Sequence, residues 1–244
     1  MAARSPDNRT PADEPLSYAF LALSYLVGAT PTSYWVGRAL HGLDLREHGS
    51  HNLGATNALR VLGWKSALPV VLIDVAKGWI PVAVFSELAG VGFPWALAYG
   101  TAAILGHMFS LWVGFKGGKG MATGAGVFLA LAPWAVLGGF AVWLALTLPT
   151  GYVSLGSVGA AFVLPFLVML SPHEGGGSLV WFSAGLAVFV IWKHRDNLRR
   201  LRLGEENRFR APKVPPISAD APEPGPPNVG HPDGAADAAH EVDG

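Results

Sequence analysis

The sequence predicts an all-α, polytopic membrane protein: a helix bundle in which seven helices cross the bilayer, with five crossing helices as the alternative. Apolar residues make up 51% of the 244 residues and charged residues only 14%, whereas a soluble domain carries about 25% charged residues. The few charges are also unevenly spread, and residues 121–172 contain no Asp, Glu, Lys, Arg or His. A spanning helix needs about 20 mostly apolar residues, so the uncharged runs are long enough to cross a membrane.

Prolines and turns divide the apolar runs into stretches of helical length. Pro133 and the Leu-Pro-Thr-Gly turn at 148–151 interrupt the longest run, because proline removes a hydrogen bond from a helix interior. The first run is too long for the core of a signal peptide and lacks a clean Ala-x-Ala-like cleavage site. Several stretches are short for a full span and must be kinked or packed against neighbours. The expected membrane helices are 16–39, 67–88, 93–115, 121–132, 134–149, 152–170 and 178–192.

Three segments rich in Lys and Arg follow the first, third and last apolar runs. The positive-inside rule places such segments in the cytoplasm. With all three on one side, the N-terminus is expected outside and the C-terminus in the cytoplasm, which requires an odd number of spans. The basic residues are Arg46, Arg60 and Lys65 in the first segment, Lys116 and Lys119 in the second, and Lys193, Arg195, Arg199, Arg200, Arg202, Arg208, Arg210 and Lys213 in the third.

The two ends of the chain differ in composition from the apolar part. Residues 211–244 contain eight prolines and no aromatic residue, so they lack the apolar surface needed to order themselves. We therefore expect a disordered segment at 1–14, a membrane-embedded domain at 15–210 and a disordered, proline-rich cytoplasmic tail at 211–244. The absence of cysteine excludes disulfides and thiolate metal sites.

The first polar stretch, HGSHNLGATNALR at 48–60, lies between two apolar runs. Its glycines allow tight turns, and its hydroxyl and amide residues favour helix caps, which aim free N–H groups at an anion. Arg60 can bind a phosphate through two parallel hydrogen bonds. An ordinary loop that only caps the next helix is the alternative. The four capping candidates are Ser50, Asn52, Thr56 and Asn57.

The second polar stretch, GFKGGKGMATGAG at 114–126, is rich in glycine and contains Lys116 and Lys119. Glycine lets an oxyanion approach the main chain, and a lysine can neutralise it. The stretch is not a Walker A loop, because Lys119 is followed by glycine and an apolar helix precedes the loop. A basic turn attracted to lipid headgroups is the alternative.

The third polar stretch, HRDNLRRLRLGEENR at 194–208, places His194 and Asn197 three residues apart, on one face of an expected helix. The alternative is a charged helix lying on anionic lipid, which explains the arginines better than it explains His194 and Asn197.

Ionisable residues also occur inside two of the expected spans. Asp74 and Lys77 can form an ion pair along one helix face, and we favour a structural pair over a catalytic one, although such groups often face a polar cavity. His107 lacks partners for a metal site, so we expect it to bond a neighbouring helix.

The three stretches together resemble the motifs of the acyl-phosphate-dependent glycerol-3-phosphate acyltransferases of bacterial membranes. The family's Ser-Gly-Asn-x-Gly-Ala-Thr-Asn-x-x-Arg motif reads S-H-N-L-G-A-T-N-A-L-R here, from Ser50 to Arg60. The K-G-G-K-G-x-A-T loop and the H-R-x-N-x-x-R-L ending match the second and third stretches. The resemblance covers residues 16–208, and three ordered motifs are far more specific than any one of them.

The resemblance implies a small helical membrane enzyme that transfers a fatty acyl group from acyl phosphate to the sn-1 hydroxyl of glycerol 3-phosphate. The products are lysophosphatidic acid and phosphate, in the first acylation of phospholipid synthesis. The implied partners are glycerol 3-phosphate, fatty acyl phosphate and membrane lipid, with no cofactor, metal, nucleic acid or obligate protein partner. The implied location is the bacterial cytoplasmic (inner) membrane, with the active site facing the cytoplasm.

The resemblance also assigns roles to individual residues. His51 is a departure, because the family has glycine there, and its side chain is expected to crowd the loop or alter its turn. Glu206 matches a glutamate that holds the structure together. The implied catalytic residues are Ser50, Arg60, Lys119, His194 and Asn197, and the implied substrate-binding residues are Asn52, Thr56, Asn57, Lys116, Gly117, Gly118, Gly120 and Ser154.

Two other function classes are weaker on the residues. Acyltransferases with a His-x-x-x-x-Asp motif need Asp five positions after a histidine, but the six histidines from His41 to His194 are followed there by Arg46, Leu53, Thr56, Trp112, Ser178 and Arg199. A transporter for an organic phosphate would show repeated halves and polar residues at mid-membrane, whereas the polar clusters here share one membrane face.

The proton acceptor for the implied reaction is left open by the sequence. Phosphate is already a good leaving group from a mixed anhydride, so the protein must mainly align the reactants and stabilise the oxyanion and the departing phosphate. No Ser-His-Asp set can be assembled, and cysteine is absent. We expect a substrate phosphate oxygen to accept the hydroxyl proton, with His194 as the alternative general base.

Overall fold

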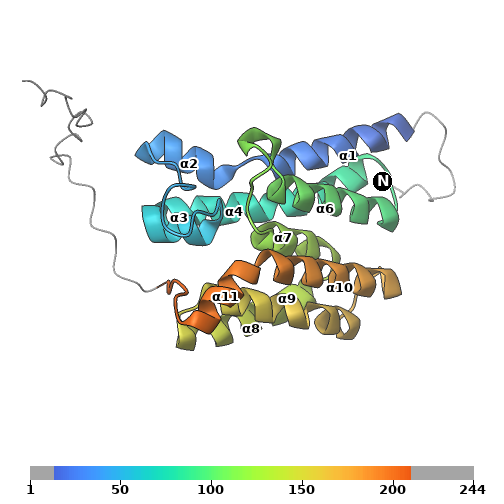
Figure 1. Ribbon diagram of the computed structural model, residues 1–244. Coiled ribbons are helices and arrows are strands. Elements are labelled where there is room, and N and C mark those ends of the chain that lie inside the picture. Colours follow the sequence, from blue (N-terminus) through green and yellow to red (C-terminus); the bar gives the residue numbers. More distant parts are fainter. Residues whose placement is uncertain (1–13, 210–244) are drawn as a thin grey trace, which may run out of the picture. The chain divides into compact units, whose positions relative to one another are not determined.

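A computed structural model describes residues 14–209 and is helical throughout the regular elements of that range (Figure 1). The predictions for residues 1–13 and 210–244 lie outside the described residues. In chain order the α-helices are α1 Glu14–Ala29, α2 Thr32–His41, α3 Ala55–Leu62, α4 Trp64–Ile80, α5 Ser86–Leu88, α6 Phe93–Met108, α7 Met121–Leu131, α8 Pro133–Thr150, α9 Val153–Leu170, α10 Gly176–Lys193 and α11 Arg195–Leu203; η1 Pro81–Phe85 is a π-helix and η2 Leu111–Val113 a 3₁₀-helix.

Within residues 14–209, five helical segments are long and apolar enough to cross a membrane, by length and composition. They are Trp64–Leu88, Phe93–Val113, Pro133–Thr150, Val153–Leu170 and Gly176–Lys193. The predicted all-helical membrane architecture is thus confirmed, but a count of seven crossing helices is not.

The first predicted span, 16–39, is two helices rather than one. The helix is interrupted at Thr30 and Pro31, which separate α1 from α2. Proline cannot donate the backbone hydrogen bond that would continue α1. The prediction of one continuous helix at 16–39 was therefore wrong. α1 has 16 residues and α7 has 11, so each is shorter than the five long segments.

The second span contains a π-helical turn. α4 continues through η1 into α5, so one helical segment runs from Trp64 to Leu88. Pro81 begins η1, and because proline lacks an N–H group, the hydrogen bonds shift register locally instead of ending the helix.

Helix α7 packs against α4 at very short backbone separation. A Cβ atom added to Gly78 of α4 would lie 2.0 Å from the carbonyl oxygen of Thr123, and one added to Gly126 of α7 would lie 2.0 Å from that of Val75. Small residues permit such contact between membrane helices. Elsewhere α1 packs on α6, α8 on α9, and α9 on α10.

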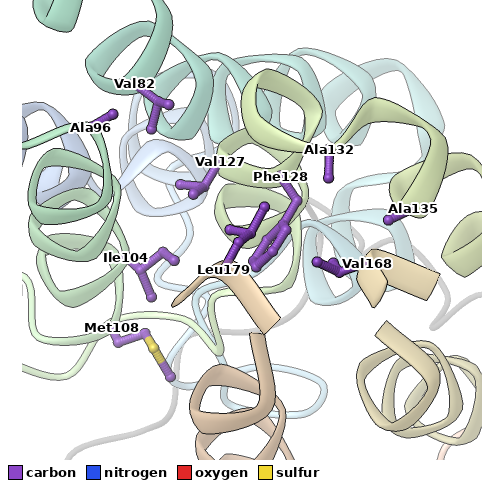
Figure 2. Close-up of a cluster of buried hydrophobic side chains, with 10 residues drawn as sticks. All are labelled: Val82, Ala96, Ile104, Met108, Val127, Phe128, Ala132, Ala135, Val168 and Leu179. Atoms are coloured by element: carbon purple, nitrogen blue, oxygen red, sulfur yellow. The ribbon is translucent and has the colours of Figure 1, made fainter. Parts of the chain in front are cut away.

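The main hydrophobic cluster surrounds α7 (Figure 2). Phe128 of α7 is 1% exposed and stacks on Phe182 of α10, with ring centroids 5.7 Å apart. Large apolar side chains such as Trp181, which is 79% exposed, lie on the outside, as expected of a surface that faces lipid. The buried members are Val82, Ala96, Ile104, Met108, Val127, Phe128, Ala132, Ala135, Val168 and Leu179.

A buried ion pair hydrogen-bonds to the residues at the interruption between α1 and α2. Lys77 Nζ lies 2.9 Å from Asp74 Oδ1 and donates a hydrogen bond to the carbonyl oxygen of Thr30 at 2.8 Å. Thr32 donates to Asp74 at 3.1 Å, and His107 Nδ1 lies 4.0 Å from the same carboxylate oxygen. The expected Asp74–Lys77 pair is confirmed, and it satisfies a carbonyl that the helix break leaves free.

A candidate active site at the polar end of the bundle

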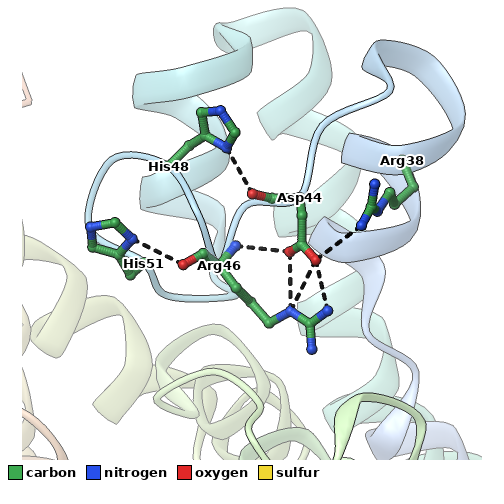
Figure 3. A network of polar contacts seen from close by, with 5 residues as sticks. All are labelled: Arg38, Asp44, Arg46, His48 and His51. Carbon is green, nitrogen blue, oxygen red and sulfur yellow. Dashed lines mark hydrogen bonds and ion pairs between the residues drawn. The ribbon is translucent and has the colours of Figure 1, made fainter. Parts of the chain in front are cut away.

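The loop between α2 and α3 is held at its start by Asp44 (Figure 3). This carboxylate is 2% exposed and accepts hydrogen bonds from the backbone N–H and the guanidinium of Arg46 and from Arg38. The hydrogen bond from Arg46 lowers the pKa of Asp44 to about 2. The carboxylate is therefore ionised at neutral pH and anchors the chain leading to Ser50.

Asn57 fixes the shape of the same loop from inside. Its Oδ1 atom accepts the backbone N–H of Ser50 at 2.8 Å, and its Nδ2 donates to the carbonyl oxygens of Leu45 and His48, each at 3.0 Å. The N-cap residue of α3 is Gly54, which has no side-chain cap bond. The predicted capping role of Ser50, Asn52, Thr56 and Asn57 was therefore wrong, because Asn57 lies in the first turn of α3 and its amide faces back toward the loop.

His51 adopts the left-handed backbone conformation, with φ 57°. Its side chain is exposed, and Nδ1 lies 2.9 Å from the carbonyl oxygen of Arg46. Glycine reaches this region without steric cost, whereas other residues do so rarely. The exposed imidazole thus bonds back to the backbone of its own loop, at a turn that favours glycine.

The glycine loop folds back onto the end of α6. Gly117 donates its N–H to the carbonyl oxygen of Met108 at 3.2 Å, and Gly118 donates to that of His107 at 3.1 Å. A Cβ atom at Gly117 would lie 2.0 Å from the His107 carbonyl oxygen, so only glycine fits. Because both N–H groups have backbone acceptors, they do not provide the expected phosphate cradle, and Lys119 is the polar side chain that the loop directs inward.

His194 occupies the junction of α10 and α11. Its Nδ1 lies 2.8 Å from the carbonyl oxygen of Val190, an arrangement that requires the proton on Nδ1 and leaves Nε2 as an acceptor in the neutral ring. Burial, reinforced by the charge of Lys119, lowers the pKa of His194 to about 4. The ring is therefore neutral at pH 7. His194 precedes α11 as its cap rather than sharing a helix with Asn197 as predicted.

A chain of hydrogen bonds joins the second and third polar stretches. Lys119 donates to the side-chain oxygen of Asn197. Asn197 Nδ2 donates to Glu206 Oε1 at 2.6 Å, and Arg200 Nε donates to Glu206 Oε2 at 2.8 Å. Burial lowers the pKa of Lys119 to about 8, partly offset by the charge of Glu206.

Arg60 and Ser154 bring incompletely bonded polar atoms to the same place. Arg60 donates from Nη2 to the carbonyl oxygen of Asn207 at 3.1 Å. Within residues 14–209, Arg60 Nε and Ser154 Oγ are buried without a hydrogen-bond partner. Burial also lowers the pKa of Arg60. Unsatisfied buried groups of this kind are rare in proteins and mark positions where a ligand can bond.

One cavity of about 510 Å³ connects these groups. Lys116, Gly117 and Gly118 do not line it; Lys116 is exposed. The cavity continues between α7, α8, α9 and α10 along apolar residues that include Phe128, Phe140 and Leu164. The predicted site residues that line the cavity are Ser50, Asn52, Thr56, Asn57, Arg60, Lys119, Gly120, Ser154, His194, Asn197 and Glu206.

Sequence reasoning missed the apolar wall of the cavity, the hydroxyl residue Ser157 and two ionisable members, Asp74 and His107. Most of the wall residues belong to the uncharged stretch 121–172, where apolar residues on lipid-facing and cavity-facing sides are indistinguishable by type. The position of ionisable residues inside expected spans was a usable signal for Asp74 and His107.

Known proteins are similar to this chain over most of the described residues. A family model described as Glycerol-3-phosphate acyltransferase matches residues 18–204. A protein of that name from Geobacter sulfurreducens is 46% identical over 190 residues, covering 78% of this chain and 96% of the relative. One from Fusobacterium nucleatum is 42% identical over 193 residues, covering 79% and 98%.

Two solved structures are also similar. The crystal structure of PlsY, an integral membrane glycerol 3-phosphate acyltransferase, in its glycerol 3-phosphate form gives a TM-score of 0.72 at 36% identity, covering 79% of this chain and 95% of that chain. The lysophosphatidic acid form gives a TM-score of 0.70 at 34% identity, covering 79% and 94%.

Proposed function

The chain belongs to the glycerol-3-phosphate acyltransferase family, and from this premise we propose that its cavity joins a fatty acyl phosphate to glycerol 3-phosphate. It is an acyltransferase that acts on glycerol 3-phosphate in phospholipid synthesis. Acyl phosphate as the donor, and the roles of individual residues given below, are parts of the proposal.

A single observation carries the proposal: one cavity is cationic at one end and apolar along the rest. Arg60 and Lys119 line the polar end, and Phe128 and Leu164 line the apolar part. Both substrates carry phosphate, for which guanidinium and ammonium groups are the usual protein partners. The donor also carries a fatty chain, which needs apolar surroundings. A cavity for glycerol 3-phosphate alone would not need the apolar part.

The carboxylates near the polar end do not compete with the substrates. Asp74 pairs with Lys77, and Glu206 accepts hydrogen bonds from Asn197 and Arg200. Their negative charge is therefore compensated within the protein, which leaves the positive charge of Lys119 and Arg60 directed at phosphate groups.

In the proposed reaction, the sn-1 hydroxyl oxygen forms a bond to the acyl carbonyl carbon, and the bond from that carbon to the phosphate oxygen breaks. Lys119 and Arg60 stabilise the phosphate as it leaves with the electron pair. The open atoms Ser154 Oγ and Arg60 Nε bind substrate oxygens, and Ser50, which lines the same cavity, is held on its loop by Asn57. The hydroxyl proton passes to a phosphate oxygen of a substrate, with His194 Nε2 as the alternative acceptor.

We further propose that the polar end faces the cytoplasm of a bacterial inner membrane. The basic segments at 46–65, 116–119 and 193–213 support this orientation through the positive-inside rule. The N-terminus would then lie outside and the C-terminus in the cytoplasm. This arrangement requires an odd number of crossings, and seven result if α1 and α7 also cross alongside the five long segments.

Phosphate release in a two-substrate assay tests the proposed function. Purified full-length protein in detergent is incubated with acyl phosphate, with glycerol 3-phosphate, or with both. The proposal expects phosphate and lysophosphatidic acid in equal amounts only when both substrates are present. Phosphate without lysophosphatidic acid, or acyl transfer from acyl-CoA but not from acyl phosphate, would contradict the proposed donor.

A further inference from the structure

The apolar part of the cavity ends at a floor of fully buried side chains. At the C-cap of α7 and on α8 and α9, each floor residue lies one helical turn from a residue that lines the cavity; on α10 the spacing is two turns. Figure 2 shows the floor residues gathered next to Phe128. The pairs of lining and floor residues are Phe128 and Ala132, Gly139 and Ala135, Leu164 and Val168, and Leu186 and Leu179; the four floor residues are 0–1% exposed.

Gly139 of α8 opens the cavity just before this floor. The residue is buried and lines the cavity, yet a Cβ atom added to it would meet no atom within 4 Å. Its neighbour Gly138 differs, because a Cβ atom there would lie 3.1 Å from the side chain of Leu167 on α9. Helix α8 therefore touches α9 at Gly138 and leaves free volume at Gly139.

The depth of the cavity can be expressed in carbon atoms. On α9, Leu164 lies ten residues from Ser154 at the polar end of the cavity, or about 15 Å at 1.5 Å per residue. An extended chain advances about 1.2 Å per bond, since a peptide unit of three bonds spans at most about 3.6 Å. The space between the polar end and the floor thus holds roughly twelve carbons of a straight acyl chain.

The side of the cavity is open toward lipid near the same depth. Leu129, Leu137 and Phe140 line the cavity, but they are 40%, 55% and 55% exposed. A longer acyl chain that reaches the floor must turn toward this side. The volume beside Gly139 determines how far the chain extends before it turns.

We propose that Gly139 is a specificity-determining residue, which together with the floor beside Phe128 sets the length of acyl chain that the cavity holds. The inference rests on the proposed function, because it assumes that the apolar part receives the acyl chain of the donor.

Filling the free volume tests the proposal directly. Gly139→Leu places a side chain in the cavity without a backbone clash, so it shortens the space for the chain. Octanoyl phosphate still fits, whereas hexadecanoyl phosphate loses the burial of several methylene groups, and its kcat/KM relative to octanoyl phosphate falls roughly tenfold. Gly185→Leu is the matched control: Gly185 lies on α10, is exposed, has no atom within 4 Å of an added Cβ and does not line the cavity.

Deepening the cavity tests the proposal in the opposite direction. Phe128→Ala removes a lining side chain that lies beside the floor and raises the kcat/KM ratio of hexadecanoyl to octanoyl phosphate. Phe182→Ala is the control, because it removes the same aromatic stack from a residue that does not line the cavity. Its ratio stays at the wild-type value.

The outcomes separate this proposal from the proposed function. An unchanged chain-length ratio in folded Gly139→Leu, or an equal change in Gly185→Leu, overturns the role of Gly139. If Gly139→Leu does not fold, Gly139→Ala must shift the ratio in the same direction by a smaller factor, and no shift in that variant counts against the proposal. Wild-type protein that transfers no acyl chain of any length instead contradicts the proposed function.

Discussion

Lys119 donates a hydrogen bond to the side-chain oxygen of Asn197, although 78 residues separate them in the sequence. The other end of the same amide donates to Glu206. Because an amide has one accepting and one donating end, Asn197 connects an ammonium to a carboxylate without bringing the two charges into direct contact. Lys119 is held in place while its charge remains directed at the cavity.

Asn197→Asp is expected to abolish most activity. The new carboxylate still accepts from Lys119, but its second oxygen replaces the Nδ2 donor that lies 2.6 Å from Glu206 Oε1. Two buried carboxylates at that distance repel each other strongly. We expect kcat/KM to fall by about a hundredfold or more and the thermal unfolding temperature to drop, since a charge-assisted hydrogen bond is worth about 1.5–3 kcal/mol.

Glu206→Gln supplies the control for that variant. In the double variant Asn197→Asp with Glu206→Gln, the glutamine amide can donate to the aspartate, which restores the direction of the bond. A double-mutant cycle should therefore give a favourable coupling of about 1–3 kcal/mol in stability. If the two substitutions lower the stability by simply additive amounts, the contact between Asn197 and Glu206 does not control the position of Lys119.

Activity should fall at alkaline pH because Lys119 loses its proton. Burial lowers the pKa of Lys119 to about 8, so the ammonium is present below pH 8 and is lost as the pH rises through that value. The profile of kcat/KM, which reports groups of the free enzyme, should have its alkaline limb near pH 8. Lys119→Arg should move this limb upward or remove it, since guanidinium keeps its proton. If the alkaline limb stays near pH 8 in Lys119→Arg, a group other than Lys119 causes it.

His194→Gln distinguishes the two possible proton acceptors. With its pKa lowered to about 4, the imidazole is neutral at pH 7 and could act as a base, and general-base catalysis contributes about 10²–10⁴-fold. If a substrate phosphate takes the proton, as we expect, the glutamine variant keeps kcat within about tenfold of wild type. A loss of a hundredfold or more, with unchanged thermal stability, would identify His194 as the base.

The membrane architecture could be predicted from the sequence because charge is costly in a bilayer. Uncharged runs located the five long segments, and the basic segments located the polar end. Pro31 was a usable signal for the helix break, as Pro133 was in the longest run, but it was overlooked because no charged residue interrupts the first run before Arg38. The ion pair of Asp74 and Lys77 that closes this break was visible as a pair, but its contact with the Thr30 carbonyl depends on tertiary packing.

The polar residues of the site could also be predicted, but not what each of them bonds to. The residue types that bind an anion are also the types that hydrogen-bond to the protein's own backbone. Residue type alone therefore does not identify the partner. Asn57 was expected at substrate; it lines the cavity and also holds the loop through three hydrogen bonds. Gly117 was expected beside phosphate, yet its N–H is bonded to the end of α6. Only the three-dimensional arrangement decides between these uses.

Replacing His51 by glycine should stabilise the protein without changing its activity. His51 has φ 57°, and a residue with a Cβ atom in this region pays about 1–2 kcal/mol in steric strain. Its exposed hydrogen bond to the Arg46 carbonyl offsets only part of that strain. We expect His51→Gly to raise the free energy of unfolding by about 0.5–1 kcal/mol, measured in detergent. His51→Val should lower it by more than about 1 kcal/mol, since branching worsens the strain; equal stability of both variants would argue against a strained turn.

Removing one member of the Asp74–Lys77 pair should be far more damaging than removing both. Lys77 is 4% exposed, so Asp74→Ala leaves a buried ammonium without its carboxylate, and breaking such a pair costs about 3–5 kcal/mol. The double variant Asp74→Ala with Lys77→Met buries no charge and should unfold at a higher temperature than Asp74→Ala alone. Arg38→Ala is the control: Arg38 also pairs with an aspartate, but its side chain is 49% exposed, so its loss should cost less than about 1 kcal/mol. If the double variant is no more stable than Asp74→Ala, the fold depends on the polar contacts of this pair with Thr30 and Thr32 rather than on charge compensation.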